Sequence, residues 1–135
     1  MGNPQPLEVA MDFIKRINAG DVNSLCELMT EGHIFQDALG KRMIGRENMR
    51  QGWSMYFQMV SDYQIHADEF FQTDDRLAIL GTASGRYVGK AAGSSTGFWE
   101  VPAAWRAQVK NGLIAEWRVY ADNQPLRKLM GDQVP

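Results

Sequence analysis

The sequence predicts one α+β domain over residues 1–135, a cone-shaped α+β barrel in which three N-terminal helices pack on a strongly curved, mixed or antiparallel sheet. Two observations carry this prediction. Apolar residues recur at helical spacing before residue 60, and from residue 62 the chain reads as strands separated by turn residues. A run of helices followed by hairpin-linked strands is typical of helices that cover one face of a sheet. A curved sheet closed off by helices leaves an open mouth, so we expect a small-molecule pocket.

The first two helices are expected on either side of the sequence NAGD. Residues 7–18 carry their apolar side chains on one face at helical spacing, which predicts the first helix. Gly20 can take the left-handed conformation that ends a helix, and Asp21 can cap a second helix at about residues 22–29. Residues 33–37 then look extended, and ALGK reads as a turn.

The third helix is expected to begin near Arg46, and the strands follow it. Bulky apolar side chains along one side of this helix indicate core more often than a cofactor site. Asn111 and Gly112 both accept positive φ, which predicts a hairpin turn between the last two strands. The sequence GKAAGSS at residues 89–95 is expected to be a flexible loop, and it lacks the spacing of a phosphate-binding loop. The strand segments are DYQIHADEFFQ, RLAILGTASGRYV, TGFWEVPAAWRAQV and LIAEWRVYAD.

Composition and charge narrow the classes of function. The net charge is −2 and no basic stripe occurs, which argues against nucleic acid as a partner. The single cysteine, Cys26, cannot form an internal disulfide, and its helical neighbours indicate a small buried hydrophobe. No long apolar run or signal-peptide pattern is present, so we expect a cytoplasmic protein without a membrane partner. His33 and His66 lack metal-ligand spacing, and neither a metal nor another cofactor is expected.

Two segments carry a resemblance to a known family. The sequence INAGDVNSLCELMTEGHIFQDALG, followed by GRENMR, resembles the ketosteroid isomerase pattern and fits it without gaps through Gly40. GLIAEWRVYAD is similar to the last strand of limonene-epoxide hydrolases and SnoaL-like proteins. The chain thus resembles the nuclear transport factor 2-like superfamily, which contains these enzymes, SnoaL-like polyketide cyclases and plain binding proteins. The resemblance implies the cone-shaped fold and a homodimer formed through the sheet face.

The resemblance also implies candidate site residues. Asp37 occupies the place of the isomerase's general base, a carboxylate in a mostly apolar site. The usual oxyanion donors are missing, because Phe13 replaces the tyrosine and Ala104 falls near the expected aspartate. Arg106, two residues after Ala104, or an indole N–H is the candidate replacement. Asp122 is a minor acid/base candidate that should point away from the pocket unless its strand bulges. The ligand-binding candidates are Phe13, Phe35, Trp53, Phe57, Ala104, Trp117 and Val119.

Ordinary structural roles compete with each candidate. Asp37 before ALG suits a turn, and Arg106 suits a solvated strand position. An epoxide hydrolase mechanism finds Val119 where its second aspartate should stand, and no Arg-x-Asp sequence on a middle strand.

The sequence leaves the function open between classes. The first hypothesis is an isomerase or cyclase, or else a lyase or hydrolase, that acts on a small apolar carbonyl compound with Asp37 as base. The alternatives are a non-catalytic protein that binds a small hydrophobic ligand, an epoxide-hydrolase-like enzyme, and a structural role of the exposed sheet face.

Overall fold

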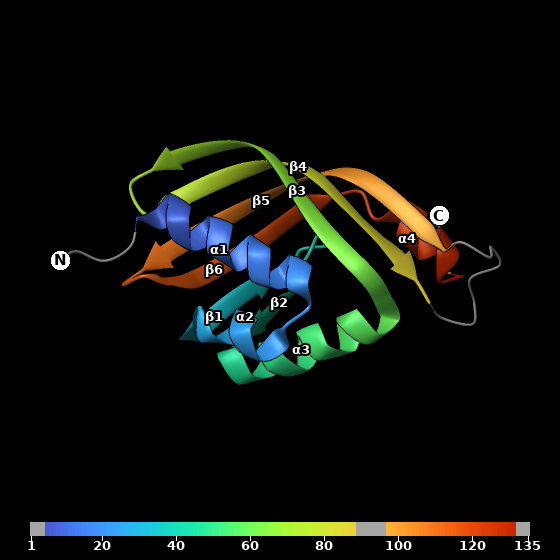
Figure 1. Ribbon diagram of the computed structural model, residues 1–135, viewed down its shortest axis with the longest axis horizontal. Coiled ribbons are helices and arrows are strands. Elements are labelled where there is room, and N and C mark those ends of the chain that lie inside the picture. Colours follow the sequence, from blue (N-terminus) through green and yellow to red (C-terminus); the bar gives the residue numbers. More distant parts are fainter. Residues whose placement is uncertain (1–4, 89–96, 132–135) are drawn as a thin grey trace.

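The computed structural model describes residues 5–88 and 97–131, and it confirms the predicted α+β class (Figure 1). The three N-terminal helices and the four long strands lie close to their predicted positions, whereas one short strand and a C-terminal helix were not expected. The second helix ends at Glu27, earlier than predicted, and the extended segment expected at 33–37 belongs to a strand that already begins at Met29. The loop predicted at residues 89–95 lies outside the described residues. The elements in chain order are α1 (Pro6–Ala19), α2 (Val22–Glu27), β1 (Met29–Gln36), β2 (Arg42–Ile44), α3 (Arg46–Met59), β3 (Val60–Thr73), β4 (Arg76–Tyr87), β5 (Phe98–Lys110), β6 (Leu113–Ala121) and α4 (Gln124–Leu129).

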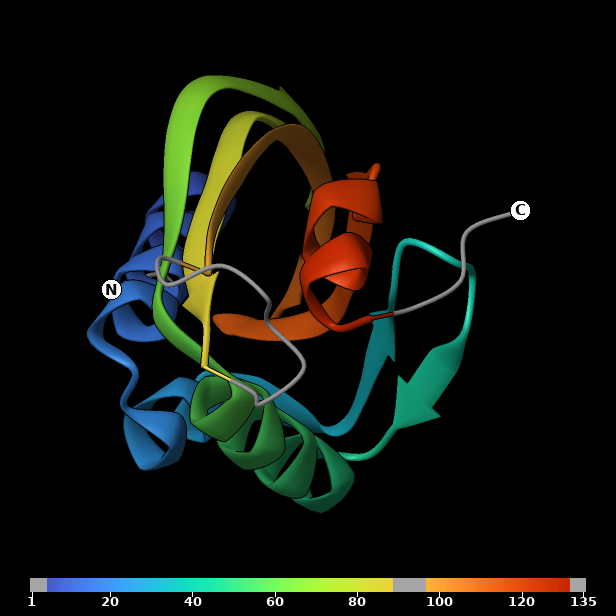
Figure 2. The ribbon, with the colours of Figure 1, turned by 90° about the vertical axis from the view of Figure 1, so that its right-hand side faces the viewer.

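The described strands form one six-stranded sheet with the order β2-β1-β6-β5-β4-β3. The β1–β6 pair is parallel and the other neighbours are antiparallel, so the sheet is mixed. Figure 2 shows the sheet curling around the core, and Figure 1 shows α4 at the end of the molecule opposite the start of α1. Helix α3 contacts β1 and β2 near one edge and β3 at the other, so it bridges the two sides of the curled sheet. The hollow that results is closed by α3 along its open side.

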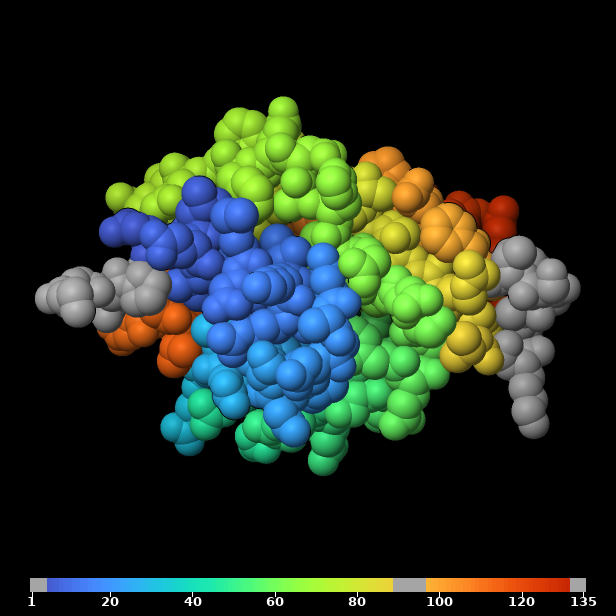
Figure 3. Space-filling view, in the orientation of Figure 1, coloured from blue at the N-terminus to red at the C-terminus, as the bar shows by residue number. Residues whose placement is uncertain are grey.

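The helix boundaries follow the signals in the sequence. Gly20 has φ 69°, and its backbone N–H donates to the carbonyls at the end of α1. The Asp21 side chain accepts a hydrogen bond of 3.1 Å from the Ser24 backbone N–H, which caps α2. Figure 3 shows α1 and α2 covering the middle of one face of the molecule. The buried face of α1 consists of Val9, Ala10, Phe13, Ile14 and Ile17.

Two irregularities bend β3 and thereby shape the hollow. The first lies between Ser61 and Gln64, where Asp62 adopts φ 53°. The second lies between Ala67 and Glu69, opposite Gly81 of β4. A Cβ at Gly81 would collide with the backbone carbonyl of His66, so only glycine fits this close approach. Extra residues of this kind bend a strand and increase its twist, which accounts for the strong curvature.

Strand β5 and its partner β6 divide the molecule into an inner and an outer side. The hairpin between them turns at Asn111 and Gly112, with φ 52° and 76°, as the sequence predicts. Alternate residues of β5, from Trp99 to Val109, are buried against the helices.

None of the described helices is long and apolar enough to cross a membrane.

Candidate functional site

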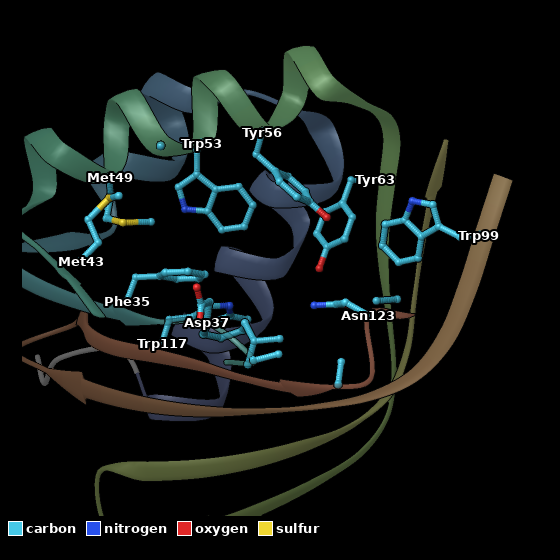
Figure 4. A pocket seen from close by; sticks show the side chains of 15 residues that line it. Phe35, Asp37, Met43, Met49, Trp53, Tyr56, Tyr63, Trp99, Trp117 and Asn123 are labelled. Atoms are coloured by element: carbon cyan, nitrogen blue, oxygen red, sulfur yellow. The ribbon is translucent and has the colours of Figure 1, made fainter. Parts of the chain in front are cut away.

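A cavity of about 310 Å³ lies between α3 and the inner side of the sheet (Figure 4). Its walls are mainly aromatic and aliphatic. Polar atoms come from a carboxylate, a side-chain amide, two phenol hydroxyls and indole N–H groups, and no lysine, arginine or histidine occurs among the lining residues that the structure describes. The lining consists of Phe35, Asp37, Ala38, Met43, Met49, Gly52, Trp53, Tyr56, Tyr63, Ala83, Trp99, Trp117, Val119, Ala121 and Asn123.

Helix α3 supplies one wall through a single stripe of side chains. Met49, Gly52, Trp53 and Tyr56 stand at spacings of three and four residues, so they share one helix face. Figure 4 shows Met49, Trp53 and Tyr56 extending from α3 toward the sheet. The sequence predicts this apolar side of the helix as core. Met49 and Trp53 are indeed buried, and the structure shows in addition that they face a cavity.

Asp37 belongs both to a turn and to the cavity wall. Its Oδ1 accepts hydrogen bonds of 2.9 Å from the backbone N–H groups of Leu39 and Lys41. These bonds close the turn that connects β1 to β2, as expected for an aspartate before ALG. The same residue lines the cavity beside Phe35 of β1. The second oxygen, Oδ2, has no hydrogen-bond partner within the described part of the chain, so it is free to meet a ligand.

Two tyrosines that sequence reasoning did not place in the site bring hydroxyl groups into it. Tyr56 of α3 and Tyr63 of β3 pack edge to face, with ring centroids 5.2 Å apart. Neither hydroxyl is hydrogen-bonded to another described residue. Burial raises the pKa of both phenols above their usual value of 10.0. Both hydroxyls therefore stay protonated at neutral pH and can donate hydrogen bonds to a ligand.

The irregularity at Asp62 is the reason that Tyr63 points inward. Val60 and Ile65 are also buried, and strict alternation from Val60 would place Tyr63 on the outer side. The extra residue at the bulge resets the alternation, so Tyr63 and Ile65 share the inner face. The helical spacing on α3 would have been enough to predict that Tyr56 faces the cavity, whereas no sequence pattern in β3 predicts the bulge.

Asn123 contributes its side-chain amide to the cavity, although an asparagine at the start of a helix normally caps that helix. It is the N-cap residue of α4, yet its side chain makes no capping hydrogen bond. Asparagine at this position usually accepts a bond from the first turn of its helix. Figure 4 shows the Asn123 amide pointing into the cavity across from Asp37. Sequence reasoning missed Asn123 because α4 was not predicted.

Four of the predicted ligand-binding residues line the cavity together with Asp37, namely Phe35, Trp53, Trp117 and Val119. The indole Nε1 atoms of Trp53 and Trp117 are buried and have no hydrogen-bond partner among the described residues. Unpaired buried donors are costly, and a polar ligand atom would relieve that cost. The binding role of these four residues remains a prediction.

Two predicted ligand-binding residues lie behind the wall. Phe13, on the buried face of α1, is fully buried, and its ring centroid is 4.9 Å from that of Trp117. Phe57 packs on Trp53 with ring centroids 5.3 Å apart. It follows Tyr56 on α3, and one residue corresponds to a turn of about 100° around the helix, away from the cavity face. Both residues support lining rings and do not line the cavity.

Ala104 and Arg106 do not line the cavity either, so the expected oxyanion donor on β5 is absent from it. Both lie on the outer side of the sheet, because the register pairs them with Tyr120 and Arg118 of β6. The Arg106 guanidinium lies 3.1 Å from Glu116, and Arg118 lies 3.0 Å from the same carboxylate. The prediction that Ala104 lines the pocket was wrong. Its register was off by one residue, and a register shift of one residue moves a side chain to the other face of the sheet.

Asp122 and the two histidines also take structural positions. Asp122 is exposed, and its Oδ1 accepts a hydrogen bond of 3.0 Å from the Gln124 backbone N–H. His33 is fully buried, with Nδ1 2.8 Å from the Ile114 carbonyl oxygen. His66 is exposed and lies 3.1 Å from Asp68. Over residues 5–88 and 97–131, no group of three metal-ligating side chains is placed to hold an ion.

Comparison with solved structures supports the fold at low sequence identity. A protein with a ketosteroid isomerase-like fold from Catenulispora acidiphila DSM 44928, in complex with trimethylamine, aligns with a TM-score of 0.80 and 19% identity over 98% of this chain and 100% of that one. IdmH, a proposed polyketide cyclase from Streptomyces antibioticus, aligns with a TM-score of 0.79 and 21% identity over 96% and 100%. A proposed polyketide cyclase from Pseudomonas putida KT2440 gives 0.81 and 19% over 94% and 98%.

Sequence comparison identifies the family. A search of curated proteins found none that matches this chain. The model of the SnoaL-like domain matches residues 10–117, a range that begins within α1 and ends within β6. The fold, the element order and this match agree: the chain belongs to the SnoaL-like domain family and has the ketosteroid isomerase-like, or NTF2-like, cone fold.

Proposed function

We propose that the protein is an acid/base isomerase or cyclase that acts on a small, mostly apolar carbonyl compound. The observation that carries this proposal is a carboxylate, Asp37, in the wall of a largely apolar cavity that also contains unpaired hydroxyl groups. A general base needs an ionisable group within reach of the substrate, and the developing oxyanion needs donors in a water-poor site. Asp37, Tyr56 and Tyr63 provide these two functions from different walls.

The proposed reaction begins with a proton transfer. Asp37 takes a proton from the carbon next to the substrate carbonyl, and the electron pair of the C–H bond moves to form an enolate. The enolate oxygen accepts hydrogen bonds from the Tyr56 and Tyr63 hydroxyls, which replace the missing donors of the isomerase pattern. Return of the proton at another carbon completes an isomerisation. Attack of the enolate carbon on a second carbonyl of the same molecule closes a ring, and the new alkoxide then takes the proton from Asp37.

Binding without chemistry is a second candidate, and one observation favours it. The two backbone hydrogen bonds to Oδ1 of Asp37 are explained by the turn alone, so this residue can serve as a fixed acceptor for a ligand. The Catenulispora neighbour contains trimethylamine, a small molecule without a carbonyl group. An epoxide-hydrolase-like reaction finds no support, because the described lining contains one carboxylate and no arginine.

Two further expectations remain proposals. A homodimer would form through the outer side of the sheet, where Phe71, Leu80 and Tyr120 are exposed. Light scattering in solution measures this directly, and a monomer at micromolar concentration would exclude it. A cytoplasmic location awaits fractionation of cells that express the protein.

Deuterium exchange tests the chemistry. The protein is incubated in D2O with a panel of small cyclic and aromatic ketones, and exchange next to the carbonyl is followed by proton NMR. Asp37→Asn keeps an oxygen for the turn hydrogen bonds and removes the base, so exchange should fall by about 100-fold or more. Asp122→Asn is the matched control, because this carboxylate is exposed and outside the cavity lining. Equal exchange by the wild type and Asp37→Asn would exclude the base.

A further inference from the structure

The composition of the cavity wall carries information about the charge of its ligand. Six aromatic side chains line the cavity, from α3, β1, β3, β5 and β6. Asp37 is the only charged residue among the described lining residues. A wall with a single negative charge repels anions, and it offers no specific contact to a neutral alkyl group beyond burial.

The rings form a continuous wall whose members face different directions. Successive ring centroids are 6.1 Å apart from Phe35 to Trp53, 6.1 Å from Trp53 to Tyr56, 5.2 Å from Tyr56 to Tyr63, and 6.1 Å from Tyr63 to Trp99. The first three pairs have interplanar angles of 71°, 89° and 90°. Rings set at right angles surround a guest on several sides instead of stacking on one.

We propose that this cavity selects a ligand that carries an alkylated ammonium group, with the aromatic wall around the methyl groups and Asp37 as the counter-charge. The inference rests on the proposed function only in using the same cavity as the ligand site, and it does not require Asp37 to act as a base. Aromatic cages attract quaternary ammonium ions through their ring quadrupoles, and the attraction grows when water is excluded. Alkylation spreads the charge over apolar surface, so desolvation costs less than for a bare ammonium ion.

The position of Asp37 fits this role. Its Oδ1 is held by the turn, and its Oδ2 has no partner in the described ranges, so the carboxylate presents a fixed oxygen to the cavity. Arg42 of β2, next to the turn, donates a hydrogen bond of 3.0 Å to the Gln36 side chain. Arg106 and Arg118 pair with Glu116 on the outer side of the sheet. No described lining residue therefore competes with a cation for Asp37.

Calorimetric titration with a charged and a neutral isostere separates charge from shape. The probes are choline and 3,3-dimethylbutan-1-ol, which have the same branched outline, while only choline carries a positive charge. We expect choline to bind the wild-type protein about tenfold more tightly, or better, than the alcohol. Asp37→Asn and Tyr56→Leu should each lower the ratio of the two affinities to about threefold or less.

Matched controls and a separate readout keep the result interpretable. Asp122→Asn and Tyr120→Leu remove the same groups outside the cavity and should keep the preference for choline. Thermal unfolding of every variant reports whether it is folded. Equal binding of the two probes, binding of the alcohol alone, or binding of neither would overturn the inference. The deuterium exchange assay is scored independently, so loss of cation selectivity with exchange intact would leave the proposed enzyme standing.

Discussion

Filling the cavity from one side is the most direct test of whether it is hollow. Ala83 of β4 is 4% exposed and lines the cavity. Ala83→Leu adds three carbons, which occupy a minor part of the 310 Å³. Each buried methylene contributes about 0.8 kcal/mol, so complete burial would raise the free energy of unfolding by at most about 2.4 kcal/mol. Because some strain offsets this gain, we expect a free energy of unfolding between unchanged and about 2 kcal/mol higher.

The control is the same substitution in packed core. Ala107 of β5 is fully buried and outside the cavity lining, so Ala107→Leu should lower the free energy of unfolding by about 1–3 kcal/mol. Urea denaturation followed by tryptophan fluorescence measures both variants. Ala83→Leu should also weaken choline binding and ketone exchange, since it takes the ligand's space. If Ala83→Leu loses as much stability as Ala107→Leu, the space is already filled and the reasoning about the site fails.

Three smaller predictions concern single groups. Tyr56→Phe and Tyr63→Phe should each slow ketone exchange by about tenfold or more because an oxyanion donor is lost, whereas Tyr120→Phe on the outer side should leave the NMR rate unchanged. Burial lowers the pKa of His33 below its usual 6.5, so just below that pH the unfolded chain binds a proton at this residue and the folded chain does not. The free energy of unfolding should therefore fall as the pH drops below about 6.5, and urea titrations should show a shallower fall for His33→Asn. Asp21→Ala should cost about 1 kcal/mol in the same titration, since α2 loses its cap; an unchanged midpoint would contradict that role.

The sequence predicts most of the fold because its strongest signals are local. Apolar spacing marks α1 and α3, and the NAGD segment marks the boundary between α1 and α2 through a glycine and a capping aspartate. The Asn-Gly turn fixes the last hairpin, since both residues adopt positive φ. Strand β2 has three exposed residues and helix α4 has six residues with one buried side chain, so neither leaves a usable pattern of apolar residues.

The candidate site was harder to predict because it depends on the register of strands that are distant in sequence. On β5, apolar residues alternate strictly from Trp99 through Trp105 to Val109, which is sufficient to place Arg106 outside. The family resemblance instead predicted Ala104 on the inner face, in conflict with this alternation. On β3 the reverse holds, since the alternation misleads until the bulge at Asp62 is known. Only the three-dimensional pairing of β3 with β4 reveals this bulge, and with it the face on which Tyr63 lies.

The two tyrosine hydroxyls in the cavity change the conclusion to be drawn from the absence of the isomerase pattern's oxyanion donors. Phe13 and Ala104 stand where the isomerase pattern has its oxyanion donors, and by sequence position alone the chemistry looks lost. Yet a hydrogen-bond donor acts through its location in the cavity, whichever element carries it. Tyr56 on α3 and Tyr63 on β3 reach the same hollow as Asp37, with their hydroxyls protonated and unpaired among the described residues. Lack of the pattern's donors therefore argues against ketosteroid isomerase geometry, and not against proton transfer in this pocket.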